Sequence, residues 1–183
     1  FNNTIKDNGD DGIHLTGSDS NNITNNSIDS QIGDGIYVSS SDNNIFRNNT
    51  FEDNTGRGIY LTGSDNNTIS NNWLEINGAA VVSLYNSDNN IISDNTIVDN
   101  LGNGIDLSDS DNNTISDNTI KGNDDDGIYL KTSDSNTISD NTIKDNENYG
   151  IYLTDNFGND IDLSGSDNNT ISGNTIKDNS EEG

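Results

Sequence analysis

The sequence predicts an all-β protein: a single-stranded parallel β-helix of seven to eight coils, each of about 23 residues with three short strands. Three observations predict this fold. The chain repeats at this period, the apolar residues of each repeat have the spacing of short strands, and asparagine recurs at fixed places. Because repeats of this kind stack only on their neighbours, we expect one solenoid domain over residues 1–183.

The first strand of each repeat is predicted by the group Gly-Ile-Tyr-Leu. Copies or near copies of this group recur once in every repeat and begin at Gly12, Gly35, Gly58, Val81, Gly104, Gly127 and Gly150. The Ile-x-Leu spacing is that of a strand with one buried face. No apolar residues recur at intervals of three or four, as a helix requires.

Two more strands are predicted around single apolar residues, such as Ile115 and Ile120, and turns rich in Gly, Asn, Asp and Ser separate them. One repeat cannot bury its apolar side chains alone. Stacking places Ile over Ile and Leu over Leu in one continuous core. The hydrophobic content of 27% is therefore sufficient, because few side chains in each coil point inward.

Two columns of amide residues predict the corners between the strands. The first column is Asn3, Asn26, Asn49, Asn72, Asn95, Asn118, Asn141 and Asn174. The second is Asn8, Gln31, Asn54, Asn77, Asn100, Asn123, Asn146 and Asn179. An amide both donates and accepts, so amides stacked about 4.8 Å apart can form ladders. Asparagine also tolerates the left-handed backbone conformation that a sharp corner requires.

These motifs carry a resemblance to a known family. The Gly-Ile-Tyr-Leu group, the Ser-Asp-Asn-Asn turn and the Ile-Ser-Asp-Asn-Thr-Ile stretch resemble the right-handed parallel β-helix repeats of NosD-like and pectate-lyase-like proteins, as in arrays of archaeal surface proteins. The resemblance covers essentially the whole chain. It implies a right-handed coil, which agrees with the general bias of parallel connections. Because the family includes lyases, hydrolases, epimerases, adhesins and surface spacers, it does not choose a function.

The charge of the chain excludes several partners. There are 32 acidic and seven basic residues, so the net charge is −25. This surface repels phosphate, and we expect no nucleic-acid partner and no binding to anionic lipid. No apolar run is long enough for membrane insertion by this segment. Cysteine is absent, which excludes disulfides and zinc–thiolate sites.

One column of aspartates predicts either a structural or a metal-binding role. Neighbouring carboxylates at the coil spacing repel by roughly 0.9 kcal/mol in water. Either nearby Ser and Asn donors with loose counter-ions offset this repulsion, so that no cofactor is required, or hard cations, Ca²⁺ before Mg²⁺, bridge the carboxylates. The column is Asp19, Asp42, Asp65, Asp88, Asp111, Asp134 and Asp167.

A second outward column lies on the first strand of each repeat and is largely aromatic. Ser83 and Asp106 interrupt it, and we add Trp73, which replaces an outward Thr or Ser of other coils. Aromatic rings on a rigid sheet can stack on sugar rings, or can simply pack against one another. The candidate sugar-stacking residues are His14, Tyr37, Tyr60, Trp73, Tyr129 and Tyr152.

The repeat breaks register once, over residues 155–164. Ten extra residues separate Ile151 from Ile161, and residues 158–164 closely copy residues 102–108. Either one copy of the strand stays in the stack while the other forms an inserted loop near Asp155 to Asn159, or a unit was partly deleted. Loops that leave a solenoid often carry function, so this loop is a candidate contact site.

The motif Asn-x-Ser/Thr, the acceptor sequence for N-linked glycans, occurs repeatedly. An asparagine-rich chain also produces this motif by chance, so the sites are candidates only. They are Asn2, Asn22, Asn25, Asn48, Asn66, Asn112 and Asn168.

We expect no catalytic residue, because the columns are nearly unbroken and Arg47 and Arg57 stand at different places in the repeat. The predicted function is a rigid acidic rod or assembly unit outside the cell. The alternatives are a carbohydrate-binding module and a fragment of a polysaccharide lyase or hydrolase. Because the chain begins and ends inside a repeat, it is expected to be a segment or a polymerising unit, with other copies, further coils of one parent chain or polysaccharide as partners.

Overall fold

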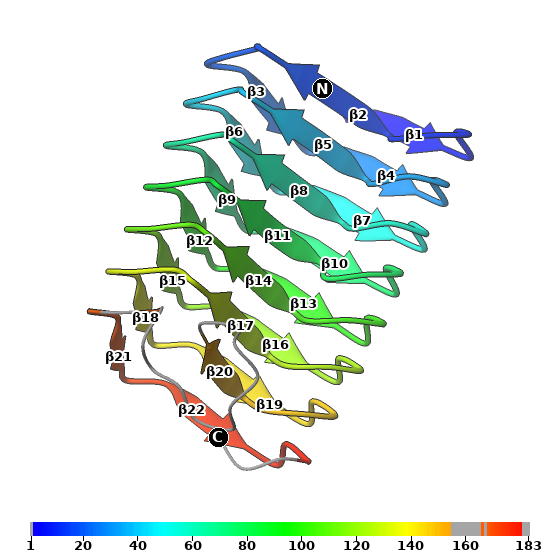
Figure 1. The fold of residues 1–183 in the computed structure, drawn as a ribbon. Helices are drawn as coiled ribbons and strands as arrows, with labels where there is room; N and C mark the ends of the chain where they lie inside the picture. The colour runs from blue at the N-terminus through cyan, green and yellow to red at the C-terminus, as the bar shows by residue number, and fades with distance from the viewer. Residues whose placement is uncertain (1, 155–165, 167, 181–183) are drawn as a thin grey trace.

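The computed structural model describes residues 2–154, 166 and 168–180 and has the predicted fold. Successive coils lie one beneath another from the N-terminal to the C-terminal end (Figure 1). In each coil the chain passes through three short strands that belong to three different parallel sheets. The described residues contain no helix long and apolar enough to cross a membrane.

The three sheets are named here by their strands. Sheet A contains β1 (Thr4–Lys6), β4 (Ser27–Asp29), β7 (Thr50–Glu52), β10 (Trp73–Glu75), β13 (Thr96–Val98), β16 (Thr119–Lys121), β19 (Thr142–Lys144) and β22 (Thr175–Lys177). Sheet B contains β2 (Ile13–Thr16), β5 (Ile36–Ser39), β8 (Ile59–Thr62), β11 (Val82–Tyr85), β14 (Ile105–Ser108), β17 (Ile128–Lys131) and β20 (Ile151–Thr154). Sheet C contains β3 (Asn22–Thr24), β6 (Ile45–Arg47), β9 (Thr68–Ser70), β12 (Ile91–Ser93), β15 (Thr114–Ser116), β18 (Thr137–Ser139) and β21 (Thr170–Ser172).

Strand pairing follows the repeat residue for residue. Ile105 pairs with Ile128, for example, and Ile115 with Ile138. Near the C-terminal end the offset changes, because β18 pairs with β21 and β19 with β22 at a separation of 33 residues. Of the two copies of the first strand, the copy at Ile151 forms β20 and pairs with β17. The predicted register break at 155–164 lies outside the described residues.

The core is a stack of inward apolar side chains, four from a typical coil. In the coil of β5, β6 and β7 these are Ile36, Val38, Phe46 and Phe51, and none of them is exposed. The cluster continues through successive coils as far as Ile143. Since each layer covers the next, the low apolar content of the sequence is enough to bury a continuous core, as predicted.

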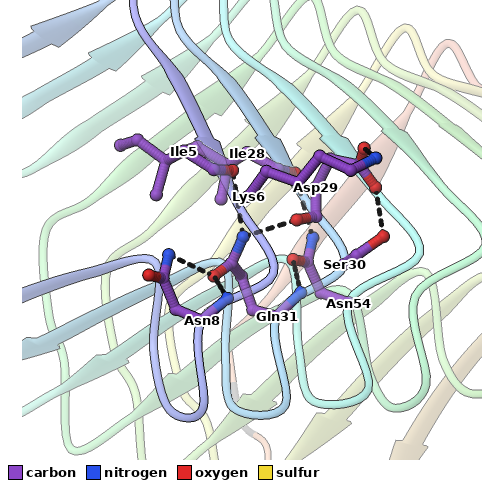
Figure 2. A network of polar contacts seen from close by, with 8 residues as sticks. All are labelled: Ile5, Lys6, Asn8, Ile28, Asp29, Ser30, Gln31 and Asn54. Carbon is purple, nitrogen blue, oxygen red and sulfur yellow. Dashed lines mark hydrogen bonds and ion pairs between the residues drawn. The ribbon is translucent and has the colours of Figure 1, made fainter.

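Both predicted amide columns form ladders. In the first, Asn49 donates its backbone N–H to Oδ1 of Asn72 at 2.9 Å, and Asn72 donates in the same way to Asn95. Figure 2 shows the second column where glutamine replaces asparagine: Oε1 of Gln31 accepts from Nδ2 of Asn8 at 2.8 Å, and the Gln31 N–H donates to Asn54 at 3.1 Å. The longer glutamine side chain keeps the ladder continuous.

The structure adds two ladders that the sequence analysis did not identify. In a third amide column, which begins with the Asn21 N–H as donor, side-chain oxygens accept backbone N–H groups at about 2.7–2.8 Å from one coil to the next: Asn44, Asn67, Asn90, Asn113, Asn136 and Asn169. In a serine column, which begins with the Ser18 N–H as donor, hydroxyl oxygens accept backbone N–H groups: Ser41, Ser64, Ser87, Ser110, Ser133 and Ser166. These side chains satisfy backbone donors at corners, where no strand partner exists.

The ladder asparagines do not themselves take the left-handed conformation that asparagine tolerates at corners. The residue just before each ladder residue takes it instead: Asn48, before Asn49, has a φ of 55°, and Asn66, before Asn67, has a φ of 58°. Turning the chain and joining the ladder are thus done by two successive residues. The left-handed residue turns the chain, and the side chain of the next residue can then point into the stack. In most coils these left-handed residues are Asn, Asp or Ser.

Ile76 departs from this rule and gives a stability prediction. It is a β-branched residue with a φ of 53° where neighbouring coils have Asp53 and Asp99. Because this conformation costs an ordinary L-residue about 1–2 kcal/mol, Ile76→Asn is expected to raise the free energy of unfolding by about 1 kcal/mol. Urea unfolding would measure the change. The matched control is Ile32→Asn, an exposed isoleucine with ordinary φ; an equal gain there would show that backbone strain is not the cause.

Candidate functional site

The outward face of sheet B carries the predicted aromatic column on adjacent strands. Tyr37 pairs with His14 on one side and with Tyr60 on the other, and Tyr129 pairs with Tyr152. The ring centroids are 4.7 Å apart for His14 and Tyr37, 5.5 Å for Tyr37 and Tyr60, and 5.7 Å for Tyr129 and Tyr152. The rings therefore form two groups, separated along the sheet by the strands of Ser83 and Asp106.

A hollow of about 240 Å³ opens beside this interruption. Side chains of β8, β11 and β14 line it, together with Arg57 from the turn before β8 and two alanines from the turn before β11. Shorter side chains produce the space, because Ala80 and Ser83 replace an arginine and a tyrosine of the previous coil. The main lining residues are Arg57, Tyr60, Ala79, Ala80, Ser83, Tyr85, Asp106 and Ser108.

Arg57 forms one wall of the hollow, and two contacts hold its guanidinium group in place. The guanidinium carbon of Arg57 lies 3.9 Å from the centroid of the Tyr60 ring. Nη1 of Arg57 lies 3.7 Å from Oδ2 of Asp34, and Oδ1 of the same carboxylate accepts the Arg57 backbone N–H at 2.7 Å. Stacking on the ring and pairing with the carboxylate orient the guanidinium, so its hydrogen-bond donors are presented in a defined direction.

Asp106 faces the same hollow. Its carboxylate accepts hydrogen bonds from Nδ2 of Asn103 at 3.1 Å and from the Ser108 hydroxyl at 3.3 Å. Burial raises the pKa of this carboxyl, while the two hydrogen bonds act in the opposite direction. Among the described residues no cationic group lies within ion-pair distance of it. The hollow thus combines an oriented donor group and a partly desolvated acceptor.

Asp126, near the Tyr129 group, gives a pH-dependent prediction. Burial raises its pKa to about 6 from an ordinary value of 3.8, against the hydrogen bond that the Tyr149 N–H donates to it. The folded protein binds this proton more tightly than the unfolded chain does, so the contribution of Asp126 to stability is present below about pH 4 and is lost as the pH rises through about 6.

Asp126→Asn keeps an oxygen for the Tyr149 N–H and removes the charge. We expect it to raise the free energy of unfolding by roughly 1 kcal/mol at neutral pH, a value reduced for partial solvent screening, and to change nothing near pH 4. Urea unfolding at the two pH values checks this. Asp124→Asn, on the exposed turn nearby, is the control; a gain of equal size at both pH values would contradict the assignment to Asp126.

Of the predicted sugar-stacking residues, Trp73 lies outside the aromatic column and His14 stands at its N-terminal end. Trp73 is the first residue of β10 and pairs with Thr50 and Thr96 in sheet A, so it does not belong to the column on sheet B. Its indole is 45% exposed and donates to Glu75 at 3.0 Å. His14 does stand in the column, and its ring nitrogens contact Asp11 at 3.1 Å and Thr16 at 3.0 Å.

The aspartate column forms a further ladder. Oδ1 of Asp42 accepts the backbone N–H of Asp65 at 2.8 Å, and the same bond joins Asp19 to Asp42, Asp65 to Asp88, Asp88 to Asp111 and Asp111 to Asp134. Asp167 lies outside the described residues. Each bond gives the carboxylate a neutral donor, which offsets part of the repulsion along the column. In the described part of the chain, no three or more His, Cys, Asp or Glu side chains are grouped as metal ligands.

All of the predicted glycan-acceptor asparagines are exposed. Asn22 lies within β3, and Asn2 precedes the first strand. The other acceptors stand at corners with a φ between 55° and 58°: Asn25, Asn48, Asn66, Asn112 and Asn168. The structure therefore places these five at the positions where the chain turns outward from the stack.

The hollow is what sequence reasoning missed. Its signal was present, because Ser83 and Asp106 break a column of aromatic residues in a nearly perfect repeat. In the sequence alone these two residues only interrupt the aromatic column. The contribution of Arg57 had no sequence signal, since it comes from the turn before β8 and reaches the same face only in the folded coil.

Comparisons with known proteins agree with this architecture. The periplasmic alginate epimerase AlgG superposes with a TM-score of 0.80 at 21% identity, covering 91% of this chain and 47% of that protein. The A-module of the mannuronan C-5 epimerase AlgE4 from Azotobacter vinelandii gives a TM-score of 0.74 at 18% identity, covering 95% and 55%. The chain thus spans about half the length of these structures, and at this identity the likeness concerns the fold alone.

No curated protein matches the sequence. The family described as "Right handed beta helix region" matches residues 1–125 and 82–183, which together include the whole chain. The repeat, the three parallel sheets and this match agree with one another, and the chain belongs to the right-handed β-helix family.

Proposed function

We propose that the outward face of sheet B binds a polysaccharide chain and that the stacked coils hold this face rigid. The observation that carries the proposal is the hollow between two aromatic groups, with Arg57 and Asp106 on its lining. Aromatic rings offer flat apolar surfaces to sugar rings, and charged groups beside them can donate to and accept from sugar hydroxyls.

Two further observations support a saccharide ligand. Solved structures that share this fold include proteins named as alginate epimerases, so some proteins of similar architecture act on polysaccharides. The net charge of −25 opposes long-range attraction of a polyanion, and Asp34 already neutralises Arg57. We therefore expect a neutral polysaccharide rather than a polyuronate.

A location outside the cytoplasm, at the cell surface, fits such a ligand.

Affinity electrophoresis tests the proposal. The protein would be run in gels that contain a soluble β-glucan, a xylan, a galactomannan, alginate or polygalacturonate. We expect retardation by a neutral polymer, and Tyr60→Ala should weaken it at least tenfold because the ring supports Arg57 at the wall of the hollow. Trp73→Ala removes an exposed aromatic residue from sheet A and should change nothing.

Retardation by none of the polymers, or equal losses for the two variants, would contradict a saccharide site on sheet B. Release of unsaturated uronide from alginate or polygalacturonate would instead identify a lyase.

The ladders favour a second candidate function, a rigid acidic rod or assembly unit. Amide, serine and aspartate ladders join successive coils in addition to the three sheets. Such a shaft resists bending, and its charge keeps it in solution. Sedimentation over a wide range of protein concentration, with and without Ca²⁺, would test assembly. A constant mass under all conditions would count against an assembling or calcium-bridged rod.

A further inference from the structure

The outward face of sheet C differs in charge from that of sheet A. The central residue of each strand points inward, so the first and third residues point outward. These outward residues include one charged side chain, Arg47, and no acidic one, in a protein with a net charge of −25. They are Asn22, Thr24, Ile45, Arg47, Thr68, Ser70, Ile91, Ser93, Thr114, Ser116, Thr137, Ser139, Thr170 and Ser172.

The outward residues of sheet A show that this composition is not a general property of the repeat. The third position of its strands is mostly charged, as in Asp29, Glu52 and Lys121. On sheet C the corresponding position is mostly serine. Sheet C therefore exposes a strip of mostly neutral hydroxyl side chains, whereas the third strand position of sheet A exposes mostly charged ones.

The exposed corner asparagines lie along the two edges of this neutral face. Asn66 and Asn112 stand two residues before the first residue of β9 and of β15, whereas Asn25 and Asn48 directly follow β3 and β6. Each of these four begins an Asn-x-Ser/Thr sequence. For Asn66 and Asn112 the third residue of the motif, Thr68 or Thr114, is itself an outward residue of sheet C.

The fold exposes the acceptor in each pair of adjacent asparagines and buries its neighbour. Asn67 is 0% and Asn113 is 1% exposed, and both belong to the third ladder. Asn66 and Asn112 are exposed, and within the described residues neither side chain forms a hydrogen bond. Their amide nitrogens are therefore accessible from solvent, and a group attached to them would not disturb a ladder.

Apolar side chains lie between the acceptor sites. Ile45 and Ile91 are 40% and 44% exposed on sheet C, in coils directly next to that of Thr68. Acceptors in alternate coils, such as Asn66 and Asn112, are about 9.6 Å apart, because one coil without an acceptor at this position lies between them. An attached glycan can spread over that intervening coil. Sugar rings over this strip would cover the exposed isoleucines with their own apolar faces.

We propose that the chain carries N-linked glycans at Asn25, Asn48, Asn66 and Asn112, and that these glycans cover the outward face of sheet C. In the attachment step, Nδ2 forms a bond to the anomeric carbon of an oligosaccharide donor linked to a polyisoprenyl phosphate. The bond from that carbon to the phosphate oxygen breaks, the amide proton passes to a base, and the phosphate carrier leaves. An oligosaccharyltransferase of the producing cell supplies the donor and the base. The proposal is independent of the saccharide site on sheet B.

The chain contains its own controls. Asn43 and Asn89 stand in the same column as Asn66 and Asn112, are exposed, and have the same left-handed backbone, with φ of 59° and 58°. The position that holds threonine in the acceptor motif holds Ile45 or Ile91 here, so these two asparagines lack the motif. Any modification that depends only on exposure would reach these two sites as well.

Peptide mass spectrometry of the protein purified from its native source tests the proposal. We expect glycan on Asn66 and Asn112 and none on Asn43 or Asn89. In the same cells, Thr114→Val should abolish the glycan at Asn112, and Ile91→Thr should create one at Asn89. Both variants should fold, because Val and Thr have similar shapes and because threonine already stands at the position of Ile91 in both neighbouring coils. Unmodified Asn66 and Asn112 in native protein, or no gain at Asn89, would overturn the proposal.

A second measurement tests coverage of the face. Enzymatic or chemical deglycosylation of the native protein should increase binding of a hydrophobic dye and promote association of the protein at high salt, because Ile45 and Ile91 become accessible. No change in either property would overturn coverage of sheet C by the glycans.

Discussion

Replacing Asn95 with alanine is expected to lower the free energy of unfolding by about 4 kcal/mol. Oδ1 of Asn95 accepts the backbone N–H of Asn72 at 2.9 Å, and its Nδ2 donates to the carbonyl oxygen of Ile69 at 3.0 Å. Asn95 is only 1% exposed, so water cannot reach the groups that lose their partner. Each buried polar group left unpaired costs about 1–3 kcal/mol, and the removed side chain also leaves a cavity.

Urea unfolding followed by circular dichroism would measure this loss. The matched control is Asn71→Gly, which removes an exposed amide beside the ladder at a φ of 55° that glycine adopts without strain. It should change the free energy by no more than about 0.5 kcal/mol. If Asn95→Ala were as mild as the control, the ladder bonds would have little net stabilising effect.

Gly104→Ala is expected to destabilise the fold by about 3 kcal/mol, through overpacking rather than loss of a bond. A Cβ atom at this buried position would lie 2.6 Å from Cγ2 of Ile120 and 2.7 Å from the carbonyl oxygen of Gly127. Both neighbours are held by the stack, so the two coils must separate locally to make room.

Val81 shows how the chain accommodates a side chain in this column. A Cβ built on Gly58 would lie 3.1 Å from the Val81 carbonyl oxygen, compared with 2.7 Å for the corresponding atoms at Gly104. The backbone is thus displaced where valine replaces glycine, in the coil beside the hollow. Gly9→Ala is the control, because a Cβ there meets no atom within 4 Å. Equal effects at Gly9 and Gly104 would contradict the packing argument.

The coil, its strands and its register could be predicted because every unit bonds to a copy of itself. An error of one residue would turn Ile105 and Leu107 outward in all coils at once, so the period alone specifies the pairing. Which asparagine of each adjacent pair forms the corner and which joins the ladder could not be predicted. Both members have the chemistry for a corner and for a ladder, and only the backbone direction assigns Asn66 to the first role and Asn67 to the second.

The candidate site was predictable only in part. The aromatic column follows from the repeat, because equivalent residues of successive coils become neighbours on one sheet. Trp73 is outward as predicted, but the repeat period does not say that its sheet is a different one from that of the aromatic column. The hollow depends on side-chain size at Ala80 and Ser83 together with the position of Arg57, and these belong to different parts of two coils.

The amide and serine ladders share one direction along the axis, which is opposite to that of the aspartate ladder. Asn72 donates its backbone N–H to the side chain of the following coil, and Ser64 and Asn67 do the same. During synthesis from the N-terminal end, each newly completed coil therefore presents a row of unpaired donors, and these remain unpaired until the next coil emerges from the ribosome. The nascent tip works as a template that selects the following repeat in the correct register. Because each coil pairs only with the coil before it, folding in this order does not require distant parts of the chain to find one another. The folding time should therefore increase with the number of coils.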